Sequence, residues 1–151
     1  MSERVMDDAV VEDVQAVIDN HDFLSWLGVE LREFEAGRVV LDLPFDEKLV
    51  NIVEGSKGTI HGGVTATLVD TASGFALRTT FENPVEPALT TTDLDINYLR
   101  PARSDLRVEA EVVRAGASMG FTDVMVYGFH DGEEKAVVKG SATYRLFRDG
   151  T

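Results

Sequence analysis

The chain has 151 residues, 44% of them hydrophobic, which is long enough to bury a substantial core as one domain. It carries 27 acidic and 14 basic side chains, a net charge of −13, which argues against nucleic acid or an anionic membrane as partner. The absence of cysteine excludes disulfides, thiolate metal sites and cysteine nucleophiles. No apolar run approaches the ~20 residues that span a bilayer, and the amino end lacks a signal-peptide pattern, so we expect a cytoplasmic protein.

The acidic residues are spread along the chain rather than gathered in a tail, and arginine outnumbers lysine ten to four. One interpretation is adaptation to a high-salt cytoplasm, in which carboxylates keep the surface hydrated and salt screens their repulsion. The other is an ordinary acidic protein. We favour the first, which predicts loss of the fold on dialysis to low salt, whereas full stability there would contradict it.

The amino-terminal residues predict an amphipathic helix. Asp7 to Asn20 carries acidic residues between apolar ones at helical spacing, namely Val10, Val11, Val14, Val17 and Ile18. An apolar cluster that includes Phe23 and Trp26 follows and ends at Gly28. His21 lies between the helix and this cluster, where a helix end or a surface position suits it better than catalysis.

Residues 29–35 and 38–43 predict two strands joined as a hairpin. Residues 46–60 show no sustained period and contain glycines, which indicates a loop of a length that is often functional. The stretch from His61 to Leu77 then predicts a helix that opens at a glycine turn, with an apolar stripe on one face and small or polar residues on the other.

Asp70 is the only ionisable side chain of that stretch beyond His61. A surface helix of such a charge-rich chain would carry more charges, so we expect this helix to be mostly buried. Because an unpaired buried charge is costly, the single carboxylate indicates a function. A structural aspartate bonded to Ser or Thr hydroxyls is the alternative interpretation.

The second half of the chain predicts strands. A rigid connection at 82–87 leads to strand-like segments at 89–99, 106–114, 118–130 and 133–147. The residues from Thr90 to Tyr98 alternate between two faces, and Asp131-Gly132 marks a tight hairpin. This order of elements predicts an α+β fold in which an antiparallel sheet covers one helix. No linker is apparent, so we expect one domain over residues 1–151, with 1–20 as a helical extension.

Three segments together carry a family resemblance. The central helix opens with Gly58-x-x-His61-Gly62-Gly63-Val64, and Asp70 follows nine positions after the histidine. Residues 91–102 read TTDLDINYLRPA, and residues 27–30 read LGVE. In these features the chain resembles the hotdog-fold acyl-CoA thioesterases of the PaaI-like group, and the likeness runs from Phe23 to Phe147.

The resemblance implies a hotdog fold, an antiparallel sheet wrapped around a long central helix, here with an additional amino-terminal helix. It implies hydrolysis of an acyl-CoA thioester to free acid and CoA, with no cofactor, because CoA is part of the substrate. It also implies homodimers that join their sheets edge to edge and hold two sites, and homotetramers built from two such dimers.

The resemblance also assigns catalytic roles. Asp70 matches the catalytic carboxylate, which acts as nucleophile or as general base on water. Gly62 matches the glycine whose amide polarises the thioester carbonyl, and Gly63 beside it also lets backbone approach a ligand closely. Thr91 matches a hydroxyl residue that places the water, and His61 matches the motif histidine near the thioester.

The substrate-binding positions depart from the family pattern. The family commonly has an asparagine six residues before the motif histidine, where this chain has Gly55. Ser56, Asn51 or a water would then grip the carbonyl. Arg100 and Arg103 are candidates for binding the CoA phosphates, with solvated charges at a strand end as the alternative.

The spacing of the catalytic residues predicts a composite site. A helix amino terminus offers free N–H groups to a developing oxyanion, and Gly62 supplies one. Eight residues of helix place Asp70 about 12 Å away, so one thioester reaches both groups only if a second copy of the chain contributes one. The sequence predicts no metal site, because His21, His61 and His130 show no ligand spacing.

Two other functions stay open. A hotdog hydratase or dehydratase would act on an enoyl or 3-hydroxyacyl thioester, but it usually pairs a close histidine with a carboxylate. A non-catalytic module that binds acyl-CoA is the other, and Gly55 at the asparagine position favours it. Aromatic, short-chain and medium-chain acyl groups are all compatible with the sequence.

Overall fold

The computed structural model describes residues 7–148. Its helices are α1 (Asp8–Asn20), α2 (Asp22–Leu27), the 3-10 turn η1 (Glu47–Leu49) and α3 (Gly62–Arg78). Its strands are β1 (Glu30–Glu35), β2 (Arg38–Leu43), β3 (Ala88–Tyr98), β4 (Leu106–Ala115), β5 (Met119–His130) and β6 (Glu133–Phe147). The predicted helices and strands are confirmed, each end lying at most one residue from its predicted place, and α2 forms where only an apolar cluster is predicted.

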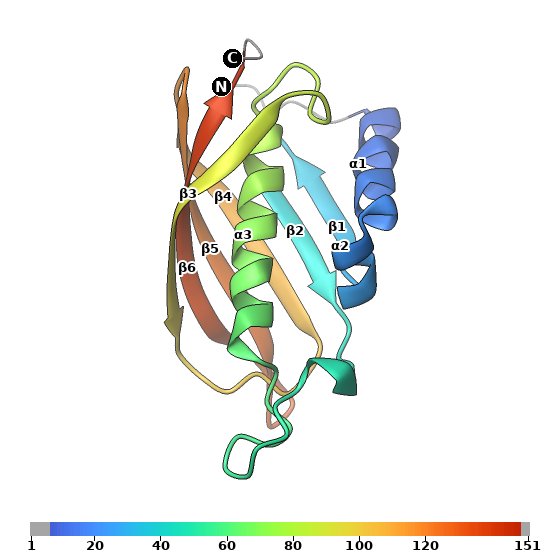
Figure 1. Ribbon diagram of the computed structural model, residues 1–151, viewed down its shortest axis with the longest axis vertical. Helices are drawn as coiled ribbons and strands as arrows, with labels where there is room; N and C mark the ends of the chain where they lie inside the picture. The colour runs from blue at the N-terminus through green and yellow to red at the C-terminus, as the bar shows by residue number, and fades with distance from the viewer. Residues whose placement is uncertain (1–6, 149–151) are drawn as a thin grey trace.

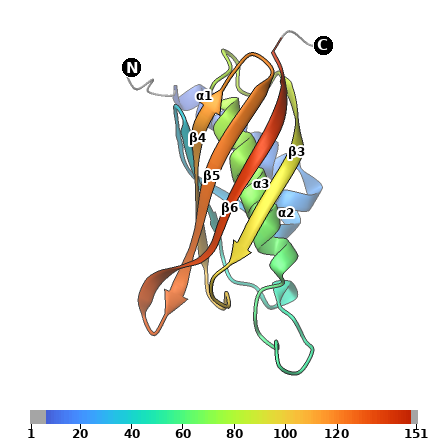
Figure 2. The same ribbon diagram turned by 90° about the vertical axis from the view of Figure 1, so that its left-hand side faces the viewer.

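The strands form one antiparallel sheet in the order β1-β2-β4-β5-β6-β3. The sheet curves around α3, which lies against one face (Figures 1 and 2). This confirms the predicted α+β hotdog arrangement of a sheet around a long central helix, with an additional amino-terminal helix. β3 lies at one edge of the sheet, so within residues 7–148 only β6 pairs with it.

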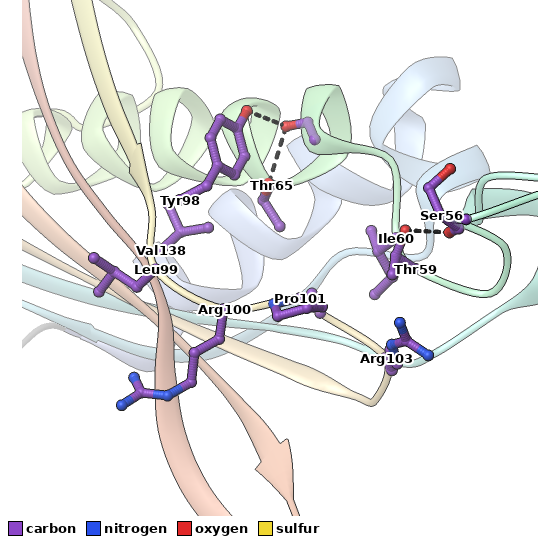
Figure 3. A pocket seen from close by; sticks show the side chains of 13 residues that line it. Ser56, Thr59, Ile60, Thr65, Tyr98, Leu99, Arg100, Pro101, Arg103 and Val138 are labelled. Carbon is purple, nitrogen blue, oxygen red and sulfur yellow. Dashed lines mark hydrogen bonds between the residues drawn. The ribbon is translucent and has the colours of Figure 1, made fainter. Parts of the chain in front are cut away.

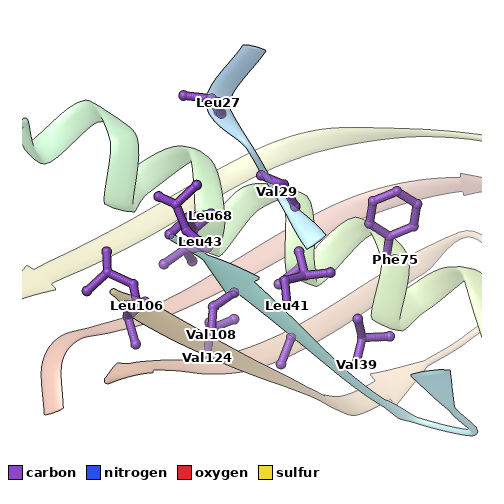
Figure 4. Packing of buried hydrophobic residues seen from close by; sticks show 14 of the residues in the cluster. Leu27, Val29, Val39, Leu41, Leu43, Leu68, Phe75, Leu106, Val108 and Val124 are labelled. Atoms are coloured by element: carbon purple, nitrogen blue, oxygen red, sulfur yellow. The ribbon is translucent and has the colours of Figure 1, made fainter. Parts of the chain in front are cut away.

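The core lies between α3 and the inward face of the sheet. Leu68 and Phe75 of α3 are buried, as are Leu41 of β2, Val108 of β4 and Val124 of β5 (Figure 4). Strand side chains that alternate inward meet the helix from several strands at once, which is why nearly the whole length of α3 is covered. The prediction of a mostly buried central helix is therefore confirmed.

The helices α1 and α2 lie beside β1, at the opposite end of the sheet from β3 (Figure 1). Val14 and Ile18 of α1 are buried, but Val17 is 41% exposed, so the packed face of α1 is narrower than predicted. The Nδ1 atom of His21 accepts a hydrogen bond from a backbone N–H at the start of α2, as expected for a histidine at a helix end. Phe23 and Trp26 of the predicted apolar cluster face outward.

A bulge in β3 changes which side chains face α3. Thr91 lies opposite Tyr144 of β6, and Asp93 lies opposite Thr143, so Thr92 is an extra residue without a partner position. The uniform alternation predicted from Thr90 to Tyr98 is wrong at this point. Because one residue is inserted, the side chains of Thr91 and Tyr98 both reach α3, although simple alternation places them on opposite faces.

The loop before α3 extends away from the body of the protein at the end where that helix begins (Figure 1). Its two ends are tied down, because the N–H of Ile60 donates to the carbonyl of Ala102 and the N–H of His61 donates to that of Leu49, both at 2.8 Å. Ile52 is 83% exposed near the tip. Over residues 7–148 no helix combines the length and apolar character needed to cross a membrane.

Candidate active site

The amino terminus of α3 presents a backbone donor. His61 caps the helix, and its Nδ1 accepts the N–H of Gly63 at 2.8 Å. No acceptor within residues 7–148 takes the N–H of Gly62, the first residue of the helix. This free amide points along the positive end of the helix dipole, where an anion or an oxyanion is stabilised.

A pocket of about 460 Å³ lies at this end of α3 (Figure 3). Its walls come from the loop before the helix and from the segment after β3, and include Ser56, Gly62, Tyr98, Arg100 and Arg103. The hydroxyl of Tyr98 donates to the carbonyl oxygen of Gly62 at 2.7 Å, which joins the end of β3 to the start of α3. The structure thus brings four of the predicted site residues together at this pocket, namely Ser56, Gly62, Arg100 and Arg103.

The remaining predicted binding residues have other contacts. The side chain of Asn51 donates to the hydroxyl of Thr59 at 2.9 Å, inside the loop, and it does not line the pocket. The backbone N–H of Gly63 already donates to Nδ1 of His61, the residue that caps α3. Arg100 donates to a backbone carbonyl of Ala136 at 2.7 Å, and over residues 7–148 it forms no ion pair with an acidic side chain.

Asp70 lies farther along α3 and is half-buried. The hydroxyl of Thr91 donates to its Oδ1 atom at 2.6 Å, and the hydroxyl of Tyr144 donates to the same atom at 2.5 Å. In the described part of the chain, the other carboxylate oxygen, Oδ2, has no hydrogen-bond partner. Oδ2 is not a buried atom, so water or a substrate can reach it while Oδ1 is held by the two hydroxyls.

Tyr144 is a site residue that the sequence reasoning missed. It lies on β6 and is only 5% exposed. Burial, followed by the hydrogen bond to Asp70, raises the pKa of Tyr144 above its ordinary value of 10.0. One signal was present, since alternation along residues 133–147 puts Tyr144 on the same face as Ala142 and Leu146, which face the helix.

A second pocket, of about 280 Å³, surrounds the carboxylate and is open to solvent. Asp70, Gly74, Phe75, Thr91 and Tyr144 are among the residues that line it. Arg78 also lines it and was missed too.

The guanidinium of Arg78 forms hydrogen bonds to the connection that follows α3. Its Nη1 donates to the carbonyls of Pro84 and Pro87, each at 2.9 Å. Burial lowers the pKa of Arg78, and the neighbouring Tyr144 offsets part of that shift. The residues that line the second pocket thus include one acid, one cation and four hydroxyl groups, two of which, those of Thr91 and Tyr144, donate to Asp70.

The two pockets share no lining residue. Eight residues of helix separate Gly62 from Asp70, or about 12 Å along the axis. A single reacting carbonyl therefore cannot contact both groups of one chain. Each group alone suits acyl chemistry, the amide as an oxyanion donor and the carboxylate as a base or nucleophile.

Comparison with known proteins establishes the family. The thioesterase superfamily matches residues 57–135, a segment that begins before the amino terminus of α3 and contains Asp70 and Thr91. The chain belongs to the thioesterase superfamily. A putative esterase of Halobacterium salinarum is 41% identical to this thioesterase-superfamily chain, over 90% of the chain and 91% of the relative. Acyl-coenzyme A thioesterase 13 of Homo sapiens is 31% identical, over 93% of the chain and 96% of the relative.

Solved structures agree with this assignment. A thioesterase family protein of Silicibacter pomeroyi matches with a TM-score of 0.81 and 28% identity, covering 92% of this chain and 98% of the other. The PaaI protein of E. coli matches with a TM-score of 0.78 over 94% of this chain and 95% of its own; at 22% identity it supports the fold alone. The predicted resemblance to PaaI-like hotdog thioesterases is confirmed.

Proposed function

We propose that this thioesterase-superfamily protein hydrolyses acyl-CoA to a free acid and CoA, without a cofactor. The observation that carries the proposal is the carboxylate of Asp70, which is held through one oxygen, on the same helix that begins with the amide of Gly62; within residues 7–148 the other oxygen and that amide have no hydrogen-bond partner. The human relative, which is named as an acyl-coenzyme A thioesterase, supports acyl-CoA as the substrate class.

The chemistry needs both groups at one carbonyl. The Gly62 amide donates to the thioester oxygen and stabilises the negative charge that develops there. Asp70 takes a proton from a water that attacks the carbonyl carbon, or its carboxylate attacks that carbon directly and water then hydrolyses the anhydride. In both routes the carbon–sulfur bond breaks, the CoA thiolate takes up a proton, and the acid is released.

A homodimer would bring the two groups together. β3 has one edge free of pairing within residues 7–148, and such an edge is a template for another strand. Thr91, which contacts Asp70, and Tyr98, which contacts Gly62, lie towards opposite ends of β3. Antiparallel pairing of two β3 strands about a two-fold axis would place Thr91 of one protomer near the partner's Tyr98, and hence Asp70 near the partner's Gly62.

Release of CoA thiol tests the proposed activity. Aromatic, short-chain and medium-chain acyl-CoAs would be tried at low and high salt, because a net charge of −13 makes salt a relevant variable. We expect thiol release from the wild type and its loss in Asp70→Asn, by a factor on the order of 100 or more, with the dimer intact by light scattering. An unchanged rate in that variant contradicts the proposal.

The rival functions give different results in the same assay. Loss of enoyl absorbance without thiol release would indicate a hydratase, and acyl-CoA binding without turnover would indicate a binding module.

Complementation tests the composite site. Gly62→Pro removes the amide hydrogen, and Asp70→Asn removes the base, so each variant alone should be inactive. When the two are co-expressed in equal amounts, half of the dimers are mixed and each mixed dimer keeps one intact site of two. We therefore expect about a quarter of the wild-type activity. A site built within one chain predicts no recovery.

A further inference from the structure

We propose that Tyr144 is a positioning residue that, seated against Gly74, joins Thr91 in holding Oδ1 of Asp70 and thereby leaves Oδ2 as the oxygen that acts on the substrate. This inference rests on the proposed function, since the reaction whose base it orients is thioester hydrolysis. It assigns the working atom within the carboxylate and a residue that the motif does not include.

The two hydroxyls reach the carboxylate from neighbouring strands. Thr91 of β3 lies directly opposite Tyr144 of β6, and the bulge at Thr92 turns Thr91 toward α3. The hydroxyl oxygens lie 2.6 Å and 2.5 Å from the same atom, Oδ1 of Asp70. A carboxylate oxygen has two lone-pair positions, so two donors saturate it and fix the plane of the carboxylate.

Gly74 makes room for the tyrosine. It follows Asp70 by one helical turn, on the same face of α3. A Cβ atom at Gly74 would lie 3.1 Å from the hydroxyl oxygen of Tyr144, closer than ordinary packing allows. The hydroxyl also lies 2.6 Å from the backbone carbonyl oxygen of Asp70, so its single hydrogen is shared between that oxygen and Oδ1. The hydroxyl is thus fixed against the main chain and the side chain of the same residue.

The titratable groups around the Asp70 carboxylate suit the positioning role of Tyr144. Arg78 of α3 and Tyr144 of β6 are the other titratable groups that line its pocket, and β3 contributes hydroxyls and a leucine there. Hydrogen bonds donated to an ionised carboxylate favour the ionised form. Because burial raises the pKa of Tyr144, the phenol keeps its hydrogen and stays a donor throughout the neutral range.

The test compares kcat and KM for thiol release in Tyr144→Phe, Gly74→Ala and the wild type. Tyr144→Phe deletes the donor and keeps the ring, so we expect kcat to fall on the order of tenfold with little change in KM. Gly74→Ala displaces the hydroxyl without deleting it and should give a smaller change in the same direction.

Two controls separate positioning from general damage. Tyr127→Phe removes a hydroxyl that has no hydrogen-bond partner in the described part of the chain and lies outside both site pockets, so its kcat and KM should match those of the wild type. In the double variant Gly74→Ala/Tyr144→Phe, the alanine should add nothing to the kinetic effect of the phenylalanine, because both act through one hydroxyl.

The outcomes are distinguishable. Thiol release by the wild type with unchanged kcat in Tyr144→Phe overturns the role of Tyr144 and leaves the proposed function standing. Absence of thiol release in the wild type overturns the proposed function, and this inference with it.

Discussion

The two parts of α3 that carry chemistry are built in different ways. At the amino terminus, the donor is the backbone amide of Gly62, and its surroundings are loop segments before α3 and after β3. Around Asp70 the groups are side chains, brought together by α3, β3 and β6. The first site depends on where a helix begins, which is local. The second depends on the register of strands far apart in the sequence, so substitutions should affect the two sites in different ways.

The largest effect expected at the amino-terminal site comes from Gly62→Pro, which removes the amide hydrogen. Proline is tolerated at the first position of a helix, and His61 before it has φ −54 and ψ 131, a conformation that suits a residue preceding proline. We expect thiol release to fall by a factor on the order of 100 to 1,000, the cost of losing one oxyanion donor.

Gly62→Ala is the matched control for that prediction. It adds a Cβ atom that would lie 3.1 Å from the hydroxyl of Tyr98, so it shares the crowding of the proline but keeps the N–H. Comparing kcat for the two variants isolates the amide. Equal losses of kcat in both variants would show that crowding, rather than loss of the Gly62 N–H, lowers the rate. The distinction between a backbone site and a side-chain site would then fail.

Arg78→Met should mainly lower stability. The variant loses two hydrogen bonds to the carbonyls of Pro84 and Pro87, which leaves both without their donor. We expect the free energy of unfolding to fall by about 1–3 kcal/mol, measured by chemical denaturation. Arg103→Met, at an exposed position, serves as the control and should stay within about 0.5 kcal/mol of the wild type. A loss of stability in Arg103→Met but not in Arg78→Met would contradict the proposed role of the Arg78 hydrogen bonds.

Thr91→Val tests the dependence of the acidic site on the strand bulge. It removes one of the two donors to Asp70, so we expect thiol release to fall on the order of tenfold. The neighbouring Thr92→Val removes a hydroxyl that bonds to the carbonyl of Thr143 instead, at 3.1 Å. That variant should stay close to the wild-type rate, and a similar loss in both would mean that the bulge does not select the working hydroxyl.

The smallest effect concerns alkaline pH. Because the pKa of Tyr144 is raised in the folded protein, the unfolded chain loses that proton first, at its ordinary pKa of 10.0. The contribution to stability is therefore complete below pH 10 and falls as pH rises further, by up to about 1.4 kcal/mol per pH unit. Denaturation between pH 9 and 11 should show a steeper decline for the wild type than for Tyr144→Phe; parallel curves would argue against burial of this phenol.

Periodicity and glycine placement in the sequence were sufficient to predict the two long helices and the strands, but not the short helix α2. The helix bounds and the hairpins depend on hydrogen bonds and side-chain spacing within a few residues. The start of α3 at Gly62 and the distance from Gly62 to Asp70 are also local features, because one continuous helix determines both. The sequence therefore predicted two chemical groups on one helix and their separation.

Only the tertiary structure decided which residues surround the Gly62 amide and the Asp70 carboxylate. Tyr144 meets Asp70 across 74 positions of sequence, through a strand register that contains the extra residue Thr92. Asn51, expected near the substrate, instead bonds inside its own loop. A bulge shifts every later side chain of a strand to the other face, and no local pattern in this sequence marks where it occurs. The residues that hold the carboxylate thus depend on the packing of the whole sheet against α3.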